Sequence, residues 1–303
     1  MVRNLMPVAQ LYGLPRALGA DLSQPGTRLL ASFEITNNFD SNSRDGDVAF
    51  YDGESYQSTL TLSRALGSER RFELGLAVPY VRHSTGHLDG FIEGFHDLFG
   101  FPDGGRSTVE RNQLDYRVGV DGTSYAALAD STGHIGDVRA WLGYQVFRDA
   151  ETSLALRTMV KVPTGSVSSL SGSGGTDVAL WAEYANTRLL APIRLEISLM
   201  AGAVLLGAGD LASSRQRDVA GFLHFGLQLP LGKRVRLHGQ LDAHTELLDA
   251  SVQQLGGSAL QGTLGGRILL SRRFWLDLGV VENLTTKSAP DVTFQIVLGS
   301  RLQ

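Results

Sequence analysis

The sequence lacks several features that mark other classes of protein. It contains no cysteine, which suits a chain that crosses an oxidising compartment. No stretch holds 18 consecutive apolar residues, and the nearest, residues 197–209, is only 13 long and rich in glycine and alanine. A membrane-spanning helix is therefore not predicted, and the mean hydropathy of -0.02 is too polar for a helical membrane protein. The net charge of -4 provides no basic face, so nucleic acid is not an expected partner.

Proline is scarce and glycine is abundant, with 9 and 36 residues, a balance that suits many strands joined by tight turns. The clearest pattern lies in residues 193–205, where every second residue is apolar. A helix would place Arg194 and Glu196 inside the apolar stripe, so the pattern predicts a strand. Its apolar side is long enough to cross a bilayer core as a tilted strand.

Other segments repeat this alternation, and together they predict an all-β protein. These segments are residues 28–37, 56–64, 72–82, 138–147, 152–162, 176–185, 220–229, 235–245, 260–270, 274–280 and 292–302. Short connections alternate with longer ones, among them a polar loop at 37–47, as in outer-membrane barrels. We therefore predict a single transmembrane antiparallel β-barrel of about twelve strands over residues 1–303, closed because an open edge in lipid would leave backbone groups unpaired.

A soluble β-sandwich is the alternative fold, because its strands alternate in the same way. Its outer faces should be rich in lysine and threonine. Here the polar side of the strands carries tryptophan (Trp141, Trp181 and Trp275) and many glycines. The membrane barrel is therefore the favoured prediction.

The polar side of the predicted strands carries charges of both signs in similar number. These lumen-lining candidates are Glu34, Glu73, Arg139, Arg157, Lys161, Asp177, Glu183, Arg194, Glu196, Arg236, His238, Asp242, His244, Arg267 and Asp277. Opposite charges on neighbouring strands can pair, for example Asp177 or Glu183 with Arg157 or Arg194. The charges either fill a narrow lumen with ion pairs or line a channel and tune its solute.

The inner face carries one candidate metal or proton-relay pattern, and catalytic groups on the lipid-facing side would mark a barrel phospholipase. His238, Asp242 and His244 share one strand, where they form either a metal or proton-relay site or, without a further ligand, part of the ion-pair network. No serine and histidine at period-two spacing have a third partner, so the signal of a barrel phospholipase is absent. No catalytic residue, metal site or cofactor is predicted.

Two segments depart from the strand pattern. Residues 1–25, with prolines at 7, 15 and 25, form either a periplasmic lead-in or a plug. The insertion at 84–133 is predicted to contain a short amphipathic helix at 87–99 and a hairpin at 116–128 with Asp121-Gly122 at its turn. The helix caps the mouth, lies among lipid headgroups or binds an apolar solute; its residues of interest are Leu88, Asp89, Phe91, Ile92, Glu93, Phe95, His96, Asp97 and Phe99.

Two family resemblances follow from local motifs. Residues 79–84 (Pro-Tyr-Val-Arg-His-Ser), 88–97 and 102–106 resemble an uncharacterised family of proteobacterial outer-membrane proteins, a domain-of-unknown-function family. That likeness runs from about Arg3 to the C-terminus and implies a barrel without assigning a site. Gly136-Asp137, residues 161–165 (Lys-Val-Pro-Thr-Gly) and Gly175-Thr176-Asp177 resemble outer-membrane proteins of aromatic-degradation (phenol meta-) pathways, which implies hydrophobic substrates.

These observations lead to a functional expectation. The protein is expected in the bacterial outer membrane, in contact with lipid and lipopolysaccharide, as a non-enzymatic, porin-like channel for small apolar or amphipathic solutes. Residues 1–3 lead directly into Asn4 without a signal peptide, so a mature form with an added start methionine is expected. The alternatives are a structural barrel with a closed, ion-paired lumen that presents outer loops to a partner, and an outer-membrane enzyme acting on lipid. The oligomeric state is left open.

Overall fold

The computed structural model describes residues 4–23, 26–86, 90, 112–190, 192–284 and 287–302. The regular elements within these residues are β-strands and two short 3-10 helices, η1 (Ala9–Leu11) and η3 (Gln253–Leu255). No helix in this part of the chain is long and apolar enough to cross a membrane.

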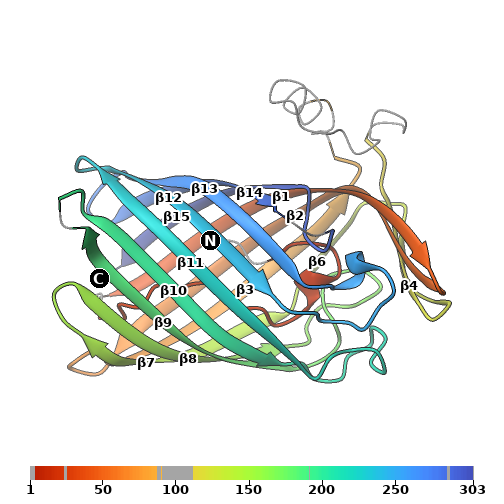
Figure 1. The fold of residues 1–303 in the computed structure, drawn as a ribbon, viewed down its shortest axis with the longest axis horizontal. Helices are drawn as coiled ribbons and strands as arrows, with labels where there is room; N and C mark the ends of the chain where they lie inside the picture. Colours follow the sequence, from red (N-terminus) through yellow and green to blue (C-terminus); the bar gives the residue numbers. More distant parts are fainter. Residues whose placement is uncertain are drawn as a thin grey trace.

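Twelve of the described strands pair antiparallel with their neighbours and close into a barrel, because β1 pairs with both β2 and β15 (Figure 1). The wall strands are β1 (Thr27–Arg44), β2 (Asp47–Leu66), β3 (Phe72–Ser84), β7 (Val138–Arg148), β8 (Thr152–Val162), β9 (Asp177–Leu190), β10 (Leu195–Leu205), β11 (Val219–Leu231), β12 (Val235–His244), β13 (Ala259–Leu269), β14 (Phe274–Asn283) and β15 (Val292–Leu302). The predicted fold class is confirmed.

The two faces of the wall differ as the period of two requires. Along β8, buried residues alternate with exposed ones such as Leu156 and Val160. Leu199, at the centre of the segment that first indicated a strand, is 39% exposed, while its neighbour Met200 faces inward and is buried. The outer surface is therefore an apolar band, and the polar side chains of the strands lie inside the barrel.

The two ends of the barrel differ in the length of their connections. Tight turns, such as residues 67–71 and 232–234, gather at one end, which we call the short-turn end. The opposite, long-loop end carries β4 (Asp115–Val120) and β5 (Thr123–Leu128), which extend the sheet beyond β2, and β6 (Thr132–Ile135), which pairs with β3 (Figure 1). The hairpin predicted at 116–128 is present, with positive φ at Asp121 and Gly122.

The polar loop predicted at 37–47 is wrong, because those residues continue β1 and β2 in register from Asn37↔Glu54 to Arg44↔Asp47. The turn between them is Asp45-Gly46, with φ of 50° and 87°, the geometry that a two-residue hairpin needs. The hydrophilic sequence reflects strands that project past the apolar band, where β4 pairs with β2.

Candidate functional site

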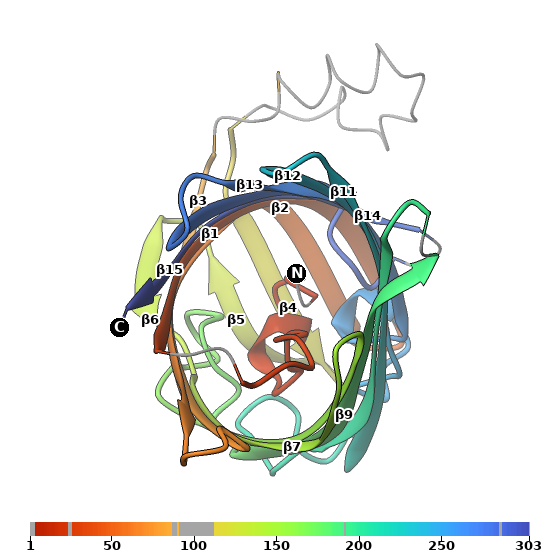
Figure 2. The same cartoon turned by 90° about the vertical axis from the view of Figure 1, so that its left-hand side faces the viewer.

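The interior of the barrel is occupied by the N-terminal segment. Figure 2 shows it in red within the ring of strands. Its apolar side chains Leu5, Met6, Val8, Leu11 and Tyr12 are each at most 2% exposed. Several of them pack in one cluster with wall side chains that point inward, namely Trp141, Met159, Trp181 and Met200. We call residues 4–22 the plug segment.

The plug segment runs lengthwise through the lumen. Near the short-turn end, the backbone N–H of Leu22 donates to Gln145 Oε1 at 2.8 Å, and Gln145 Nε2 donates to the carbonyl of Ala20 at 3.0 Å. At the long-loop end, Asn4 Nδ2 donates to the carbonyl of Ser288 at 2.6 Å and lies 2.8 Å from His244 Nε2. The segment therefore obstructs the lumen along most of its length.

Charged wall residues bind the backbone of the plug segment between these two ends. Lys161 Nζ donates to the Leu11 carbonyl at 2.9 Å, and the N–H of Gly13 donates to Asp177 Oδ2 at 2.7 Å. Further along, Arg28 donates to the carbonyl of Leu18 at 3.0 Å, and Arg157 to that of Gly19 at 2.7 Å. An irregular segment has backbone groups that no sheet satisfies, so these contacts supply the partners that burial demands.

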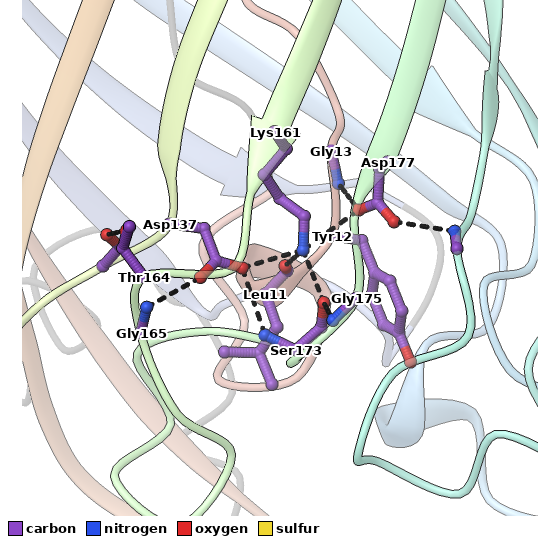
Figure 3. A network of polar contacts seen from close by, with 12 residues as sticks. Leu11, Tyr12, Gly13, Asp137, Lys161, Thr164, Gly165, Ser173, Gly175 and Asp177 are labelled. Atoms are coloured by element: carbon purple, nitrogen blue, oxygen red, sulfur yellow. Dashed lines mark hydrogen bonds and ion pairs between the residues drawn. The ribbon is translucent and has the colours of Figure 1, made fainter.

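The first cluster of buried charges surrounds Lys161 at the end of β8 (Figure 3). Lys161 Nζ lies 2.8 Å from Asp137 Oδ2 and 3.1 Å from Asp177 Oδ2, and all three side chains are at most 2% exposed. Asp137 also accepts the N–H of Gly165 at 2.9 Å, and Asp177 accepts that of Gly207 at 3.1 Å. The Lys161 ammonium therefore connects the plug segment with β9, and the two aspartates that it contacts bind two loops.

The second cluster lies on β3, β8 and β9 around Arg157, which is 1% exposed. Its guanidinium pairs with Glu73 at 2.9 Å and with Glu183 at 3.0 Å, so one of the pairings expected from the sequence is present. Arg28 approaches Glu73 from β1 at 3.3 Å. Glu183 in turn accepts the N–H of Leu18 at 3.0 Å and the indole N–H of Trp181 at 2.9 Å.

The structure places the other predicted lumen residues as follows. Glu34 is buried and pairs with Arg16 of the plug segment at 2.9 Å. Arg139 is buried beside the Lys161 cluster, where it donates to the carbonyl of Asp137 at 3.1 Å. On the opposite wall, Arg236 pairs with Glu196 at 3.2 Å and Arg267 pairs with Asp277 at 2.6 Å.

Arg194 does not line the lumen, which corrects the prediction for that residue. It lies exposed in the turn between β9 and β10 with φ of 54°, and β10 begins only at Leu195. The strand begins two residues later than the sequence pattern predicts, because Ile193 and Arg194 continue the alternation in sequence although the backbone is still in the turn. The residues of the predicted helix at 87–99, apart from Gly90, lie outside the described residues.

Beside the plug segment the barrel retains a cavity of about 380 Å³. It extends from Met200 and His224 to Asn186 and Arg301 near the short-turn end. Its lining combines apolar side chains, including Leu18, Met200 and Trp275, with cationic ones, including Arg28, Arg267 and Arg301. The volume is in the range of small-molecule sites.

Three side chains beside this cavity form a contact chain that the sequence did not reveal. Ser198 Oγ lies 3.3 Å from His224 Nε2, and His224 Nδ1 lies 2.8 Å from Asp242 Oδ1. They come from β10, β11 and β12, so only the strand register brings them together. Of the three histidine-strand candidates, Asp242 joins this chain, His244 contacts Asn4, and His238 lines the cavity. In the described ranges, no group of three or more His, Asp or Glu is arranged to hold a metal ion.

Comparison with known proteins agrees with the architecture. Residues 1–302 match the family described as "Protein of unknown function (DUF3187)". The COG4313 outer membrane channel from Pseudomonas putida F1 superimposes with a TM-score of 0.66 at 14% identity, covering 96% of this chain and 100% of that chain. The NanC porin gives a TM-score of 0.49 at 7% identity, covering 91% and 99%. The toluene transporter TbuX from Ralstonia pickettii gives 0.45 at 10% identity, covering 99% of both. No curated protein matches the chain.

Proposed function

We propose that this protein, which belongs to the DUF3187 family, is a channel of the bacterial outer membrane for small apolar or amphipathic solutes. The observation that carries the proposal is a closed barrel whose outer wall is apolar and whose lumen holds a cavity of about 380 Å³ beside a bound plug segment. An apolar outer band and a closed wall are what a lipid-embedded barrel requires. The fold shared with the Pseudomonas putida channel agrees with this location.

The solute class follows from the lining of the lumen. Leu18, Met200 and Trp275 offer apolar surface, and Arg28, Arg267 and Arg301 add cationic groups along the same cavity. A solute with an apolar body and one polar or anionic group finds both kinds of partner there. Transfer through the barrel requires the plug segment to shift, because it fills the space beside the Lys161 and Arg157 clusters.

The competing proposal is a structural barrel that presents its loops to a partner. It is favoured by one observation: the charged lumen residues are largely engaged with one another or with the backbone of the plug segment. In that case the barrel stays closed to solutes, and lipid and lipopolysaccharide contact its outer face only.

Solute block of ionic current separates the two proposals. A variant lacking residues 4–22 is recorded in planar bilayers containing lipopolysaccharide, first alone and then with benzyl alcohol or sorbitol at equal concentration. A channel for amphipaths predicts interruptions of the current with benzyl alcohol and none with sorbitol. Equal effects of both solutes would contradict the proposed solute class, and a folded variant without current would support the structural barrel.

A further inference from the structure

Ser198, His224 and Asp242 stand in the order of a nucleophile, a base and an orienting carboxylate. The serine oxygen lies 3.3 Å from His224 Nε2, and the opposite ring nitrogen, Nδ1, lies 2.8 Å from the aspartate. Such distances are typical of a serine–histidine pair without substrate, which is often looser than the reacting complex. Serine–histidine–carboxylate triads occur on unrelated folds, so the role of each residue is assigned from its position in the contact chain and not from its position in the sequence.

The register of the wall explains how these residues meet. His224 stands directly opposite Asp242, and Ser198 stands opposite Gly226, one inward position along the same strand from His224. A methyl group on Gly226 would overlap the Ser198 hydroxyl and would lie 3.1 Å from His224 Nε2. The glycine therefore leaves room for the diagonal contact between serine and histidine.

Two of the three residues line the cavity. Ser198 and His224 line the cavity of about 380 Å³, and Asp242, whose side chain is 20% exposed, contacts Nδ1 of His224 without lining that cavity. A serine and a histidine that both line a small-molecule cavity, with a carboxylate on the other ring nitrogen, supply the nucleophile, base and orienting group that acyl transfer uses. Gln240 lines the same cavity and stands opposite Gly226 on β12.

A second serine–histidine pair in the barrel provides a contrast. Ser55 Oγ lies 2.8 Å from His83 Nδ1, but the other ring nitrogen of His83 lies 3.2 Å from the carbonyl of Leu170. That pair has a backbone carbonyl where a triad has a carboxylate, and neither residue lines the large cavity. It serves as a natural comparison.

We propose that Ser198, His224 and Asp242 hydrolyse small carboxylic esters that enter the lumen cavity. Ser198 Oγ attacks the ester carbonyl while His224 Nε2 takes its proton, and the tetrahedral intermediate expels the alcohol, which receives that proton. Water then attacks the acyl-serine with His224 again as base, which releases the carboxylic acid and restores the serine. Asp242 holds the imidazole and stabilises its cationic form. The Gln240 carboxamide donates to the oxyanion, as such holes require.

The cavity also defines the substrate. Its volume suits an ester with a short apolar acyl or alkyl part that packs against Leu18, Met200 and Trp275. The product would be a carboxylate beside Arg267 and Arg301, which line the same cavity. Ester hydrolysis is a further activity beyond the passage of a solute, and the two are tested by different experiments.

Covalent labelling tests the proposal directly. The refolded full chain and the variant lacking residues 4–22 are treated with a small alkyl fluorophosphonate, and adducts are located by peptide mass spectrometry. Hydrolysis of p-nitrophenyl butyrate is measured on the same samples. We expect one adduct on Ser198 and a loss of hydrolysis of at least about a hundredfold in Ser198→Ala and in His224→Gln.

Ser55→Ala is the matched control and should keep both the adduct and the hydrolysis rate. Circular dichroism and heat-modifiable gel migration identify which variants have folded. Absence of a Ser198 adduct in every folded form, or hydrolysis that persists unchanged in folded Ser198→Ala, would overturn the proposal. Neither result depends on conductance, so failure of the channel proposal would be seen separately.

Discussion

Arg157→Met tests whether buried ion pairs hold the interior of the barrel together. The guanidinium is 1% exposed, pairs with Glu73 at 2.9 Å and Glu183 at 3.0 Å, and donates to the carbonyl of Gly19 at 2.7 Å. Methionine retains much of the side-chain volume but none of these contacts. Glu73 keeps Arg28 at 3.3 Å, so Glu183 is the carboxylate left without its cationic partner.

The expected loss follows from that unbalanced charge. Removing one member of a buried ion pair costs about 3–5 kcal/mol, because the remaining charge stays desolvated. The double variant Arg157→Met with Glu183→Gln removes both charges, and pairs replaced as a whole are often neutral in stability. We therefore expect the double variant to recover most of the lost free energy of unfolding, although the Gly19 carbonyl still lacks its donor.

Urea unfolding in detergent, followed by tryptophan fluorescence, measures both effects. Trp181 is a suitable reporter, because its indole N–H donates to Glu183 at 2.9 Å. The matched control is Arg188→Met, since Arg188 forms an exposed pair with Glu151 at 3.2 Å, and such pairs contribute at most about 1 kcal/mol. Equal unfolding midpoints for Arg157→Met and Arg188→Met would refute the reasoning.

Three further predictions concern the outer band, the inner packing and the plug segment. Leu199→Arg should lower the free energy of unfolding in bilayers by about 2–4 kcal/mol and Leu199→Ala by much less; equal losses would contradict the assigned facing. Gly75→Ala should lower the free energy of unfolding in urea by about 1–3 kcal/mol, because the added methyl group would overlap the Trp141 ring. The control Gly239→Ala should be tolerated, because its methyl group meets only Leu264 at 3.7 Å. The chain has no native cysteine, so maleimide labelling can report on single introduced cysteines. Because Val8 is 0% exposed and Ser68 is exposed, Val8→Cys should be labelled far more slowly than Ser68→Cys until urea is added. Comparable labelling rates would place the plug segment outside the lumen.

Strand positions and facing were predictable because they depend on local alternation. Leu199 and Met200 occupy opposite faces for the same reason that their neighbours do, and the lipid requirement fixes which face is apolar. The hairpin extension was missed because residues 37–47 are predominantly polar, which weakens the apolar–polar alternation that marks a strand. Its turn, Asp45-Gly46, has the same Asp-Gly dipeptide that predicted the hairpin turn at Asp121-Gly122.

The interior arrangement was less predictable, because it depends on which strands become neighbours. Asp137 is separated from Lys161 by 24 residues and from Asp177 by 40, yet the three meet at one point. Asp137, Lys161 and Asp177 therefore form a cluster that binds the plug segment, which their sequence motifs did not predict. The contact chain of Ser198, His224 and Asp242 was not predictable for the same reason. Its members lie on three different strands, so no spacing within one strand indicates that they meet.

Single-channel conductance tests the central claim, that the plug segment closes the lumen of a transport barrel. The parent and the variant lacking residues 4–22 are refolded and recorded in the same bilayers, with circular dichroism to confirm that both barrels are intact. We predict small or intermittent current for the parent and steady, larger conductance for the variant. Equal conductance of the two folded proteins would contradict the claim.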